Sequence, residues 1–181
     1  MKKVALFLAN GFEEIEALGT TDILRRAQID VVTVSITNDK TVKGAHNIKV
    51  EADNTFSNID FTDFDILILP GGMPGAKNLN EHEELKKLLT EFNSKQKFIA
   101  AICAAPMVLG GLGLLKNKRA TCYPGFEPEL IGATITGENV VVDENIITGK
   151  GPGLVFDFGL RIVEQLLGLQ VRREVQNGLL L

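Results

Sequence analysis

Cys103 stands at a place in the sequence that can make a cysteine reactive. It directly follows the apolar run Phe98–Ile102 and precedes Ala104-Ala105-Pro106. A buried strand would therefore deliver the thiol to a sharp turn from which a helix departs at once, the layout of a nucleophile elbow. The N–H groups and dipole of a helix N-terminus favour a thiolate, and a thiol pKa below about 8.5 makes a cysteine nucleophilic near neutral pH. The alternative is a buried core cysteine, and Cys122, which lacks this context, is assigned a structural or incidental role.

Glu16 is the acid that the sequence offers as a partner for this thiol. The run Glu13-Glu14-Ile15-Glu16 opens an amphipathic segment after the first apolar strand. Glu13 and Glu14 are interpreted as charges that compensate the helix dipole on a solvated face. Glu16 lies on a different face from Glu14, toward the strand ends, where desolvation would favour its neutral form. A protonated Glu16 could donate a hydrogen bond to the Cys103 thiolate or shuttle protons.

A glycine-rich loop, Pro70-Gly71-Gly72-Met73-Pro74-Gly75, ends another buried strand. One interpretation is a plain turn. The other is an oxyanion-binding loop, in which the backbone N–H groups of Gly72 and Ala104 converge on an anionic oxygen. Glycine content alone does not decide between the two.

The elements that must position these residues alternate along the chain. Short apolar runs are typical of strands buried on both faces, and longer amphipathic runs are typical of helices that cover a sheet. The alternation predicts an α/β fold with a mostly parallel sheet, whose reactive groups lie at the carboxyl ends of the strands. Strands are predicted at Val4–Leu8, Val31–Ile36, Asp65–Leu69 and Phe98–Ile102, hairpins over 41–50 and 140–148, and helices at Glu13–Ala27, Glu81–Phe92, from Ala104, at Leu154–Leu167 and in a short tail.

Length and composition limit the class of protein. The 181 residues suit one compact domain over 1–181, and a 45% hydrophobic content is enough for a covered sheet. A net charge of −4 argues against a nucleic-acid partner, and no apolar stretch reaches the roughly 18 residues of a membrane span. The two cysteines form no CxxC and the two histidines no ligand cluster with them, so we expect a reducing cytoplasm and no metal site. No phosphate-binding glycine motif occurs, and no cofactor is expected.

Several segments together resemble the ThiJ/PfpI superfamily, in the branch of the parkinsonism-associated protein DJ-one and its bacterial relatives. They are Glu13–Glu16, Leu69–Gly72, Ala100–Pro106 and Gly151–Gly153, and the resemblance runs from Lys3 to about Glu174. It implies a flavodoxin-like sandwich that forms homodimers. It also places the family's nucleophile on Cys103, its partner glutamate on Glu16, and its oxyanion amides on Gly72 and Ala104.

The chain departs from the family pattern at several positions. Tyr123 stands where the human protein has a histidine near the cysteine, and a neutral phenol is a poorer general base at pH 7. His46 replaces an arginine that helps to hold an anion, and Arg26 matches a second basic position, one that could face a partner subunit's site. Ala104 follows the nucleophile where the protease and chaperone branches carry a histidine. The Cys-His dyad of those branches is therefore absent, and the chain also lacks the downstream His-x-Glu that a class I glutamine amidotransferase needs, so protease and amidotransferase activities are both disfavoured.

Two functions follow from these residues. The first is cofactor-independent handling of reactive carbonyls, of the glyoxalase type, in which methylglyoxal becomes lactate, or of the deglycase type; the substrate would be a small aldehyde or a glycated molecule. Cys103 would add to the aldehyde and Glu16 would move the proton. The second is a redox sensor or chaperone in which Cys103 oxidises to a sulfinate without significant turnover.

Overall fold

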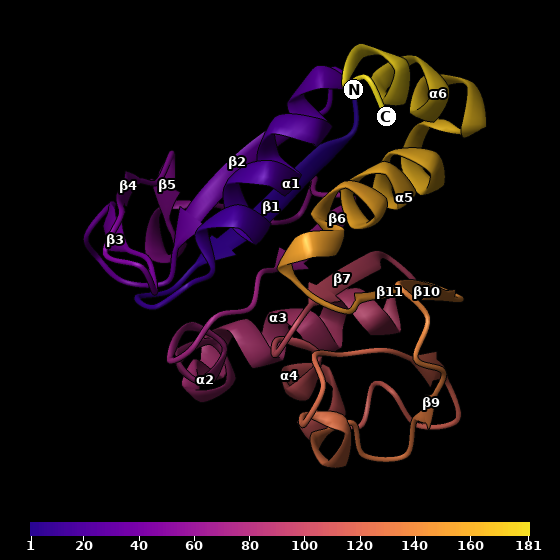
Figure 1. Ribbon diagram of the computed structural model, residues 1–181. Helices are drawn as coiled ribbons and strands as arrows, with labels where there is room; N and C mark the ends of the chain where they lie inside the picture. Colours follow the sequence, from indigo (N-terminus) through magenta and orange to yellow (C-terminus); the bar gives the residue numbers. More distant parts are fainter.

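A seven-stranded, mostly parallel sheet forms the centre of the protein (Figure 1). The computed structural model describes all residues, 1–181. The strand order is β10-β11-β7-β6-β1-β2-β5, and only the β10–β11 pair is antiparallel. The strands are β1 (Lys3–Leu8), β2 (Asp30–Ser35), β5 (Asn54–Thr55), β6 (Ile66–Leu69), β7 (Phe98–Ile102), β10 (Val140–Asp143) and β11 (Ile146–Gly149).

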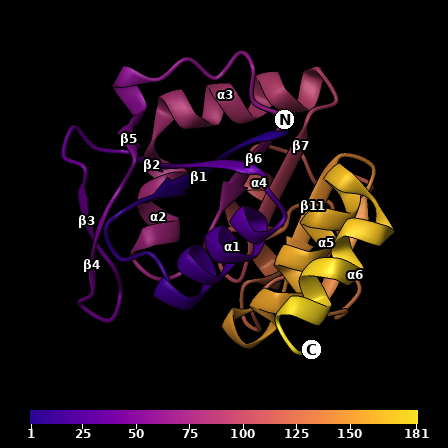
Figure 2. The ribbon, with the colours of Figure 1, turned by 90° about the horizontal axis from the view of Figure 1, so that it is seen from above.

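Helices cover both faces of this sheet (Figure 2). Alternate residues of each strand point to opposite faces, so β1 contributes Val4, Leu6 and Leu8 to one core and Ala5 and Phe7 to the other. The first core packs under α1 (Glu14–Arg26), α5 (Val155–Leu167) and α6 (Leu169–Gly178), and the second under α2 (Gly75–Glu81), α3 (Glu83–Ser94) and α4 (Pro106–Gly111).

Smaller elements lie outside the main sheet. A hairpin joins β3 (Thr41–Lys43) to β4 (Lys49–Glu51), and a short parallel pair joins β8 (Arg119–Ala120) to β9 (Thr134–Ile135). Three 3₁₀ turns are Phe56–Asn58, Glu127–Glu129 and Pro152–Leu154. None of the helices has the length and hydropathy needed to cross a membrane.

The predicted flavodoxin-like architecture is confirmed, and both predicted hairpins are present. The sequence did not predict α2. The helix expected over Glu81–Phe92 begins at Glu83 instead, because His82 ends α2 and caps α3. Its ring Nδ1 accepts a hydrogen bond from the Leu85 backbone N–H at 3.1 Å, which satisfies a free donor at the start of α3.

Candidate active site

Cys103 occupies the turn between β7 and α4, as the elbow pattern predicted. Its φ of 65° is in the left-handed region, which non-glycine residues rarely adopt. The backbone is held on both sides: the Cys103 N–H donates to the Gly149 carbonyl at 2.9 Å, and its carbonyl accepts from the Tyr123 N–H at 2.8 Å. Pro106 begins the helix that follows. The strained residue is therefore fixed by β7, β11 and the segment after α4, an arrangement typical of functional sites.

Glu16 is fully buried in the first turn of α1 and faces the thiol. Its Oε2 accepts a hydrogen bond from the Gly71 N–H at 2.7 Å. The other oxygen, Oε1, is buried without a conventional partner, and the Cys103 thiol is the side chain with which the carboxyl interacts. Desolvation raises the pKa of Glu16 to about 7 despite the Gly71 hydrogen bond. This carboxyl therefore exchanges its proton near neutral pH, as its predicted position implied.

The pKa of the Cys103 thiol moves in the opposite direction to the one predicted from the elbow. Burial and the neighbouring charge of an ionised Glu16 raise the thiol pKa to about 12, whereas the amides of Gly72 and Ala104 lower it. Cys103 is only 9% exposed as a residue, so the desolvation cost of ionising its thiol outweighs the effect of the two backbone donors. A reactive thiolate in this site therefore requires that the proton reside on Glu16.

Gly71 and Gly72 bring their loop against the thiol and the carboxyl. A Cβ at Gly71 would lie 2.7 Å from the Cβ of Cys103 and 2.8 Å from Glu16 Oε2. Gly72 has a φ of +87°, and a Cβ there would overlap the backbone of Glu13. The amides of Gly72 and Ala104 both act on the thiol. The sequence predicted a role for the Gly72 amide but none for Gly71, although Gly71 stands beside it at the end of the same strand.

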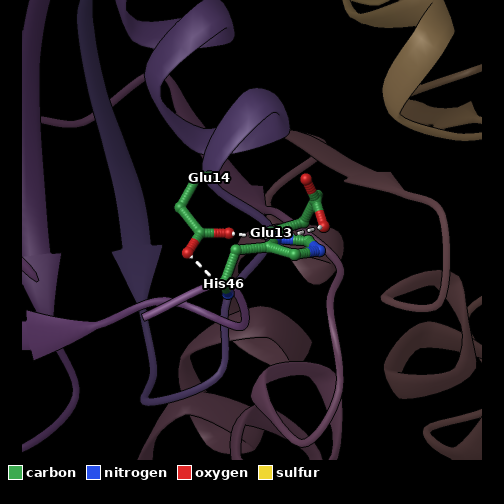
Figure 3. Close-up of side chains that lie close together, drawn as sticks. All are labelled: Glu13, Glu14 and His46. Carbon is green, nitrogen blue, oxygen red and sulfur yellow. Dashed lines mark hydrogen bonds and ion pairs between the residues drawn. The ribbon is translucent and has the colours of Figure 1, made fainter. Parts of the chain in front are cut away.

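Glu13 and Glu14 do not lie on a solvated face, contrary to the sequence interpretation. Glu14 is 5% exposed, and His46, from the turn of the β3–β4 hairpin, lies against its carboxylate (Figure 3). Its Oε1 accepts from the His46 backbone N–H at 2.7 Å, and its Oε2 lies 2.8 Å from His46 Nδ1. Gly44 permits this approach, since a Cβ there would overlap the Glu14 carboxylate. Tertiary packing of the hairpin therefore turns a surface acid into a buried one.

The ionisation of this cluster follows from its contacts. Burial acts to raise the pKa of Glu14, but hydrogen bonds from His46 outweigh it and lower the pKa below its ordinary value. The same hydrogen bond, together with the charges of Glu13 and Glu14, raises the pKa of His46. His46 thus contacts two carboxylates, a cluster that the sequence did not predict, since it indicated only that the histidines form no ligand cluster with the cysteines.

The auxiliary residues named from the sequence occupy different places. The Tyr123 backbone binds the Cys103 carbonyl, and its ring packs next to Gly151 and is partly exposed, so it lies beside the site. Arg26 is the last residue of α1, whereas Glu16 is in the first turn, and it pairs with Asp22 at 2.7 Å. Arg26 is therefore not brought to the Cys103 of its own chain.

A cysteine at a strand–turn–helix junction, a buried carboxyl and a glycine loop define an α/β protein with a nucleophile-elbow site. The profile of the DJ-1/PfpI family matches residues 2–165. The chain therefore belongs to the DJ-1/PfpI family.

Individual relatives agree with this assignment. The chain is 40% identical to protein DJ-1 homolog B of Arabidopsis thaliana, covering 99% of this chain and 42% of that protein. It is 36% identical to the glutathione-independent glyoxalase DJ-1 of Schizosaccharomyces pombe, over 92% of each chain. The chain thus spans under half the length of the two Arabidopsis relatives that it matches.

Solved structures show the same fold. Drosophila melanogaster DJ-1beta superposes with a TM-score of 0.94 at 36% identity, covering 99% of this chain and 98% of that one. Toxoplasma gondii DJ-1, in a structure described as oxidized, superposes with a TM-score of 0.95 at 33% identity and the same coverage.

Proposed function

We propose that this protein converts reactive 2-oxoaldehydes, such as methylglyoxal, to 2-hydroxy acids without a cofactor. The observation that carries the proposal is the contact between Cys103 and Glu16 under the Gly71–Gly72 loop, which places a nucleophile beside a carboxyl that titrates near neutrality. The Schizosaccharomyces pombe relative is named a glutathione-independent glyoxalase, which supports the same reaction class. Glycated proteins, the substrates of a deglycase, form when such an aldehyde adds to a protein side chain, so the carbon that Cys103 would attack derives from the same aldehyde.

The reaction needs no external oxidant. The Cys103 sulfur adds to the aldehyde carbon, and the carbonyl oxygen takes up a proton to give a hemithioacetal. Glu16 then removes the hydrogen from this carbon as a proton and returns it to the adjacent ketone carbon through an enediol. The former aldehyde carbon is oxidised to a thioester while its neighbour is reduced to an alcohol. Water hydrolyses the thioester, releasing lactate and the free thiol.

The amides of Gly72 and Ala104 are proposed to stabilise the anionic oxygen in these steps. Both act on the thiol in the free protein, so they point into the region where the adduct oxygen would form. Preorganised backbone donors of this kind contribute about 3 kcal/mol to a transition state. Tyr123 lies at the border of the site and is not assigned a step.

The test is consumption of methylglyoxal with formation of lactate. We expect activity in the wild type and a loss of about a hundredfold or more in Cys103→Ser. Cys122→Ser is the matched control, since Cys122 is buried and belongs to the opposite core, and it should retain activity. Glu16→Gln keeps the shape but cannot accept the proton, so it should be as impaired as Cys103→Ser. Equal turnover by the wild type and Cys103→Ser would refute the proposal.

A redox-sensing role is the second candidate, and the same geometry favours it. A protonated Glu16 and the Gly72 and Ala104 amides would hydrogen-bond the oxygens of an oxidised sulfur. Two peroxide molecules would oxidise the thiolate first to sulfenate and then to sulfinate, each losing water. A solved relative is described as oxidized. Mass spectrometry after mild peroxide should then show two added oxygens on Cys103 and none on Cys122, with no lactate formed from methylglyoxal.

We further propose that the chain works as a homodimer in a reducing cytoplasm, with neither nucleic acid nor membrane as a partner. Exposed apolar side chains support the dimer: Ile15 and Leu18, one turn apart on α1, are 58% and 40% exposed, and Ile48 in the hairpin is 52% exposed. Both cysteines are free thiols, which suits a reducing compartment.

A further inference from the structure

Glu13, Glu14 and His46 form a second cluster of titratable side chains, one that does not include Cys103 or Glu16 (Figure 3). The Glu residues come from the start of α1 and the histidine from the β3–β4 hairpin, more than thirty residues along the chain. One ligand atom from each of the three lies within 4.8 Å of the others. We propose that these residues bind a divalent transition-metal ion such as Zn²⁺, through one imidazole nitrogen and two carboxylate oxygens.

The spacing of the three side chains suits such an ion. His46 Nδ1 is 2.8 Å from Glu14 Oε2 and 3.6 Å from Glu13 Oε2. Ligands about 2.0 to 2.1 Å from a tetrahedral Zn²⁺ lie roughly 3.4 Å from one another. These two distances fall on either side of that value, and the ligand oxygens of Glu13 and Glu14 lie within 4.8 Å of each other, so the three side chains would have to shift to surround the ion evenly. The fourth position of the tetrahedron would remain for water or an anionic ligand.

The burial of the carboxylates gives a second, independent reason. The Glu14 side chain is 6% exposed and the Glu13 side chain 12% exposed, whereas His46 is 67% exposed. No lysine or arginine pairs with either carboxylate, and the imidazole is the one cationic group that contacts them. Two desolvated carboxylates that share one imidazole attract a dication more strongly than a single surface acid does. The exposed edge of His46 leaves a path for the ion.

The surroundings also hold the ligands in place. The His46 backbone N–H donates to Glu14 Oε1 at 2.7 Å, which leaves Oε2 to face the imidazole. The Glu13 backbone N–H donates to the Gly71 carbonyl at 2.9 Å, so the residue is anchored to the loop of the Cys103 site. Outer contacts of this kind orient metal ligands and increase affinity. The mixed imidazole and carboxylate set favours Zn²⁺, Co²⁺ or Ni²⁺ over Mg²⁺ or Ca²⁺, which prefer oxygen alone.

The test is calorimetric titration of the full chain with Zn²⁺, in a Cys103→Ser, Cys122→Ser background that removes both thiols as competing ligands. We expect one ion per chain, and affinity about tenfold or more weaker after His46→Ala or Glu13→Gln. Glu13→Gln keeps the volume of the side chain, and the His46 side chain is 67% exposed, so neither change should disturb packing, which circular dichroism would check. Equal affinity in His46→Ala and the parent would overturn the proposal, as would binding of less than one ion.

Histidine NMR supplies an internal control, because the chain has only two histidines. Addition of Zn²⁺ should shift the ring signals of His46 and leave those of His82, which caps α3, unchanged. Mg²⁺ at the same concentration should shift neither. A response of His82, or of both rings alike, would mean unspecific binding and would contradict the site. Because the readouts are binding and spectra, they are independent of turnover at Cys103.

Discussion

At Gly71, the absence of one methyl group decides whether Cys103 and Glu16 can lie together. The loop packs so closely that any side chain there would enter the space of the thiol and the carboxyl. The same closeness lets the Gly71 N–H reach Glu16. The chemistry of the site is therefore set by a residue that carries no functional group.

We predict that Gly71→Ala destabilises the protein by about 1 to 3 kcal/mol, since overpacking forces a backbone shift. It should also reduce methylglyoxal turnover. Gly153→Ala is the matched control: a Cβ there meets nothing within 4 Å, so its free energy of unfolding should change by about 0.5 kcal/mol or less. Urea unfolding of the wild type, Gly71→Ala and Gly153→Ala measures the change in the free energy of unfolding for each variant. If Gly71→Ala matched the control in stability, the close packing would be wrong.

The pH profile of Cys103 alkylation tests where the proton resides. Near pH 7 the pair loses one proton, since burial raises the pKa of Glu16 to about 7. If the remaining proton then resides on Glu16, the sulfur is a thiolate above this pH. The rate of alkylation by iodoacetamide should in that case rise up to about pH 7 and level off above it. A rate that instead climbs steadily from pH 7 to beyond pH 10 would mean that the thiol ionises alone near its raised pKa of about 12.

Folding stability should also depend on Glu16. Its pKa rises from the ordinary value of 4.5 to about 7 on folding, so the unfolded chain releases this proton first as the pH increases. The free energy of unfolding therefore decreases as the pH rises from 4.5 to about 7, by about 3 kcal/mol in total, and stays lower above pH 7. Glu16→Gln has no such proton. Unfolding free energies of the two proteins at pH 4.5 and pH 8 should therefore diverge, and parallel values would contradict the burial argument.

At the scale of elements, α4 fixes the direction in which the chain leaves Cys103. This helix has six residues, too few to be stable alone, so it depends on its packing. Gly110 faces the backbone of Glu129 so closely that a Cβ would overlap its carbonyl, while the next residue, Gly111, faces open space apart from Asn80 at 3.8 Å. Two adjacent glycines of one helix thus have opposite environments.

We predict that Gly110→Ala destabilises the fold by about 1 to 3 kcal/mol, because α4 must move away from Glu129. Gly111→Ala should be neutral or stabilising, since alanine has the higher helix propensity. Thermal unfolding of both variants provides the comparison. Equal destabilisation by the two substitutions would contradict the prediction, because only Gly110 lies against the Glu129 backbone and helix propensity favours alanine at both positions.

At the scale of the whole molecule, the two sheet faces are covered by helices, yet α1 keeps apolar side chains on its outer surface. Ile15 and Leu18 belong to the same helix that presents Glu16 inward. A second copy that covers this surface would therefore also stabilise the helix on which the site depends.

We predict that sedimentation at micromolar concentration shows a dimer, and that Ile15→Glu shifts it to monomer, since a buried unpaired charge opposes association. Ile131→Glu is the control, because Ile131 is similarly exposed, at 63%, but lies beyond the Glu127–Glu129 turn, far along the chain from α1. A monomeric wild type would contradict the prediction, and so would an Ile15→Glu variant that remains a dimer.

The sequence by itself determined the alternation of strands and helices, both hairpins and the turn that carries Cys103. These features depend on local periodicity and on residues that adjoin in the chain, such as Pro106 at the first position of α4. The sequence did not predict the break between α2 and α3, because the cap that His82 provides depends on the conformation of its side chain.

Only the tertiary structure decided the protonation behaviour of the site residues. Glu16 meets Gly71 across 55 residues, and His46 meets Glu14 across 32. A side chain's pKa depends on the solvent it loses and on the charges it meets. Both are fixed by how distant segments pack, and so the sequence pattern predicted the position of the thiol but not the direction of its pKa.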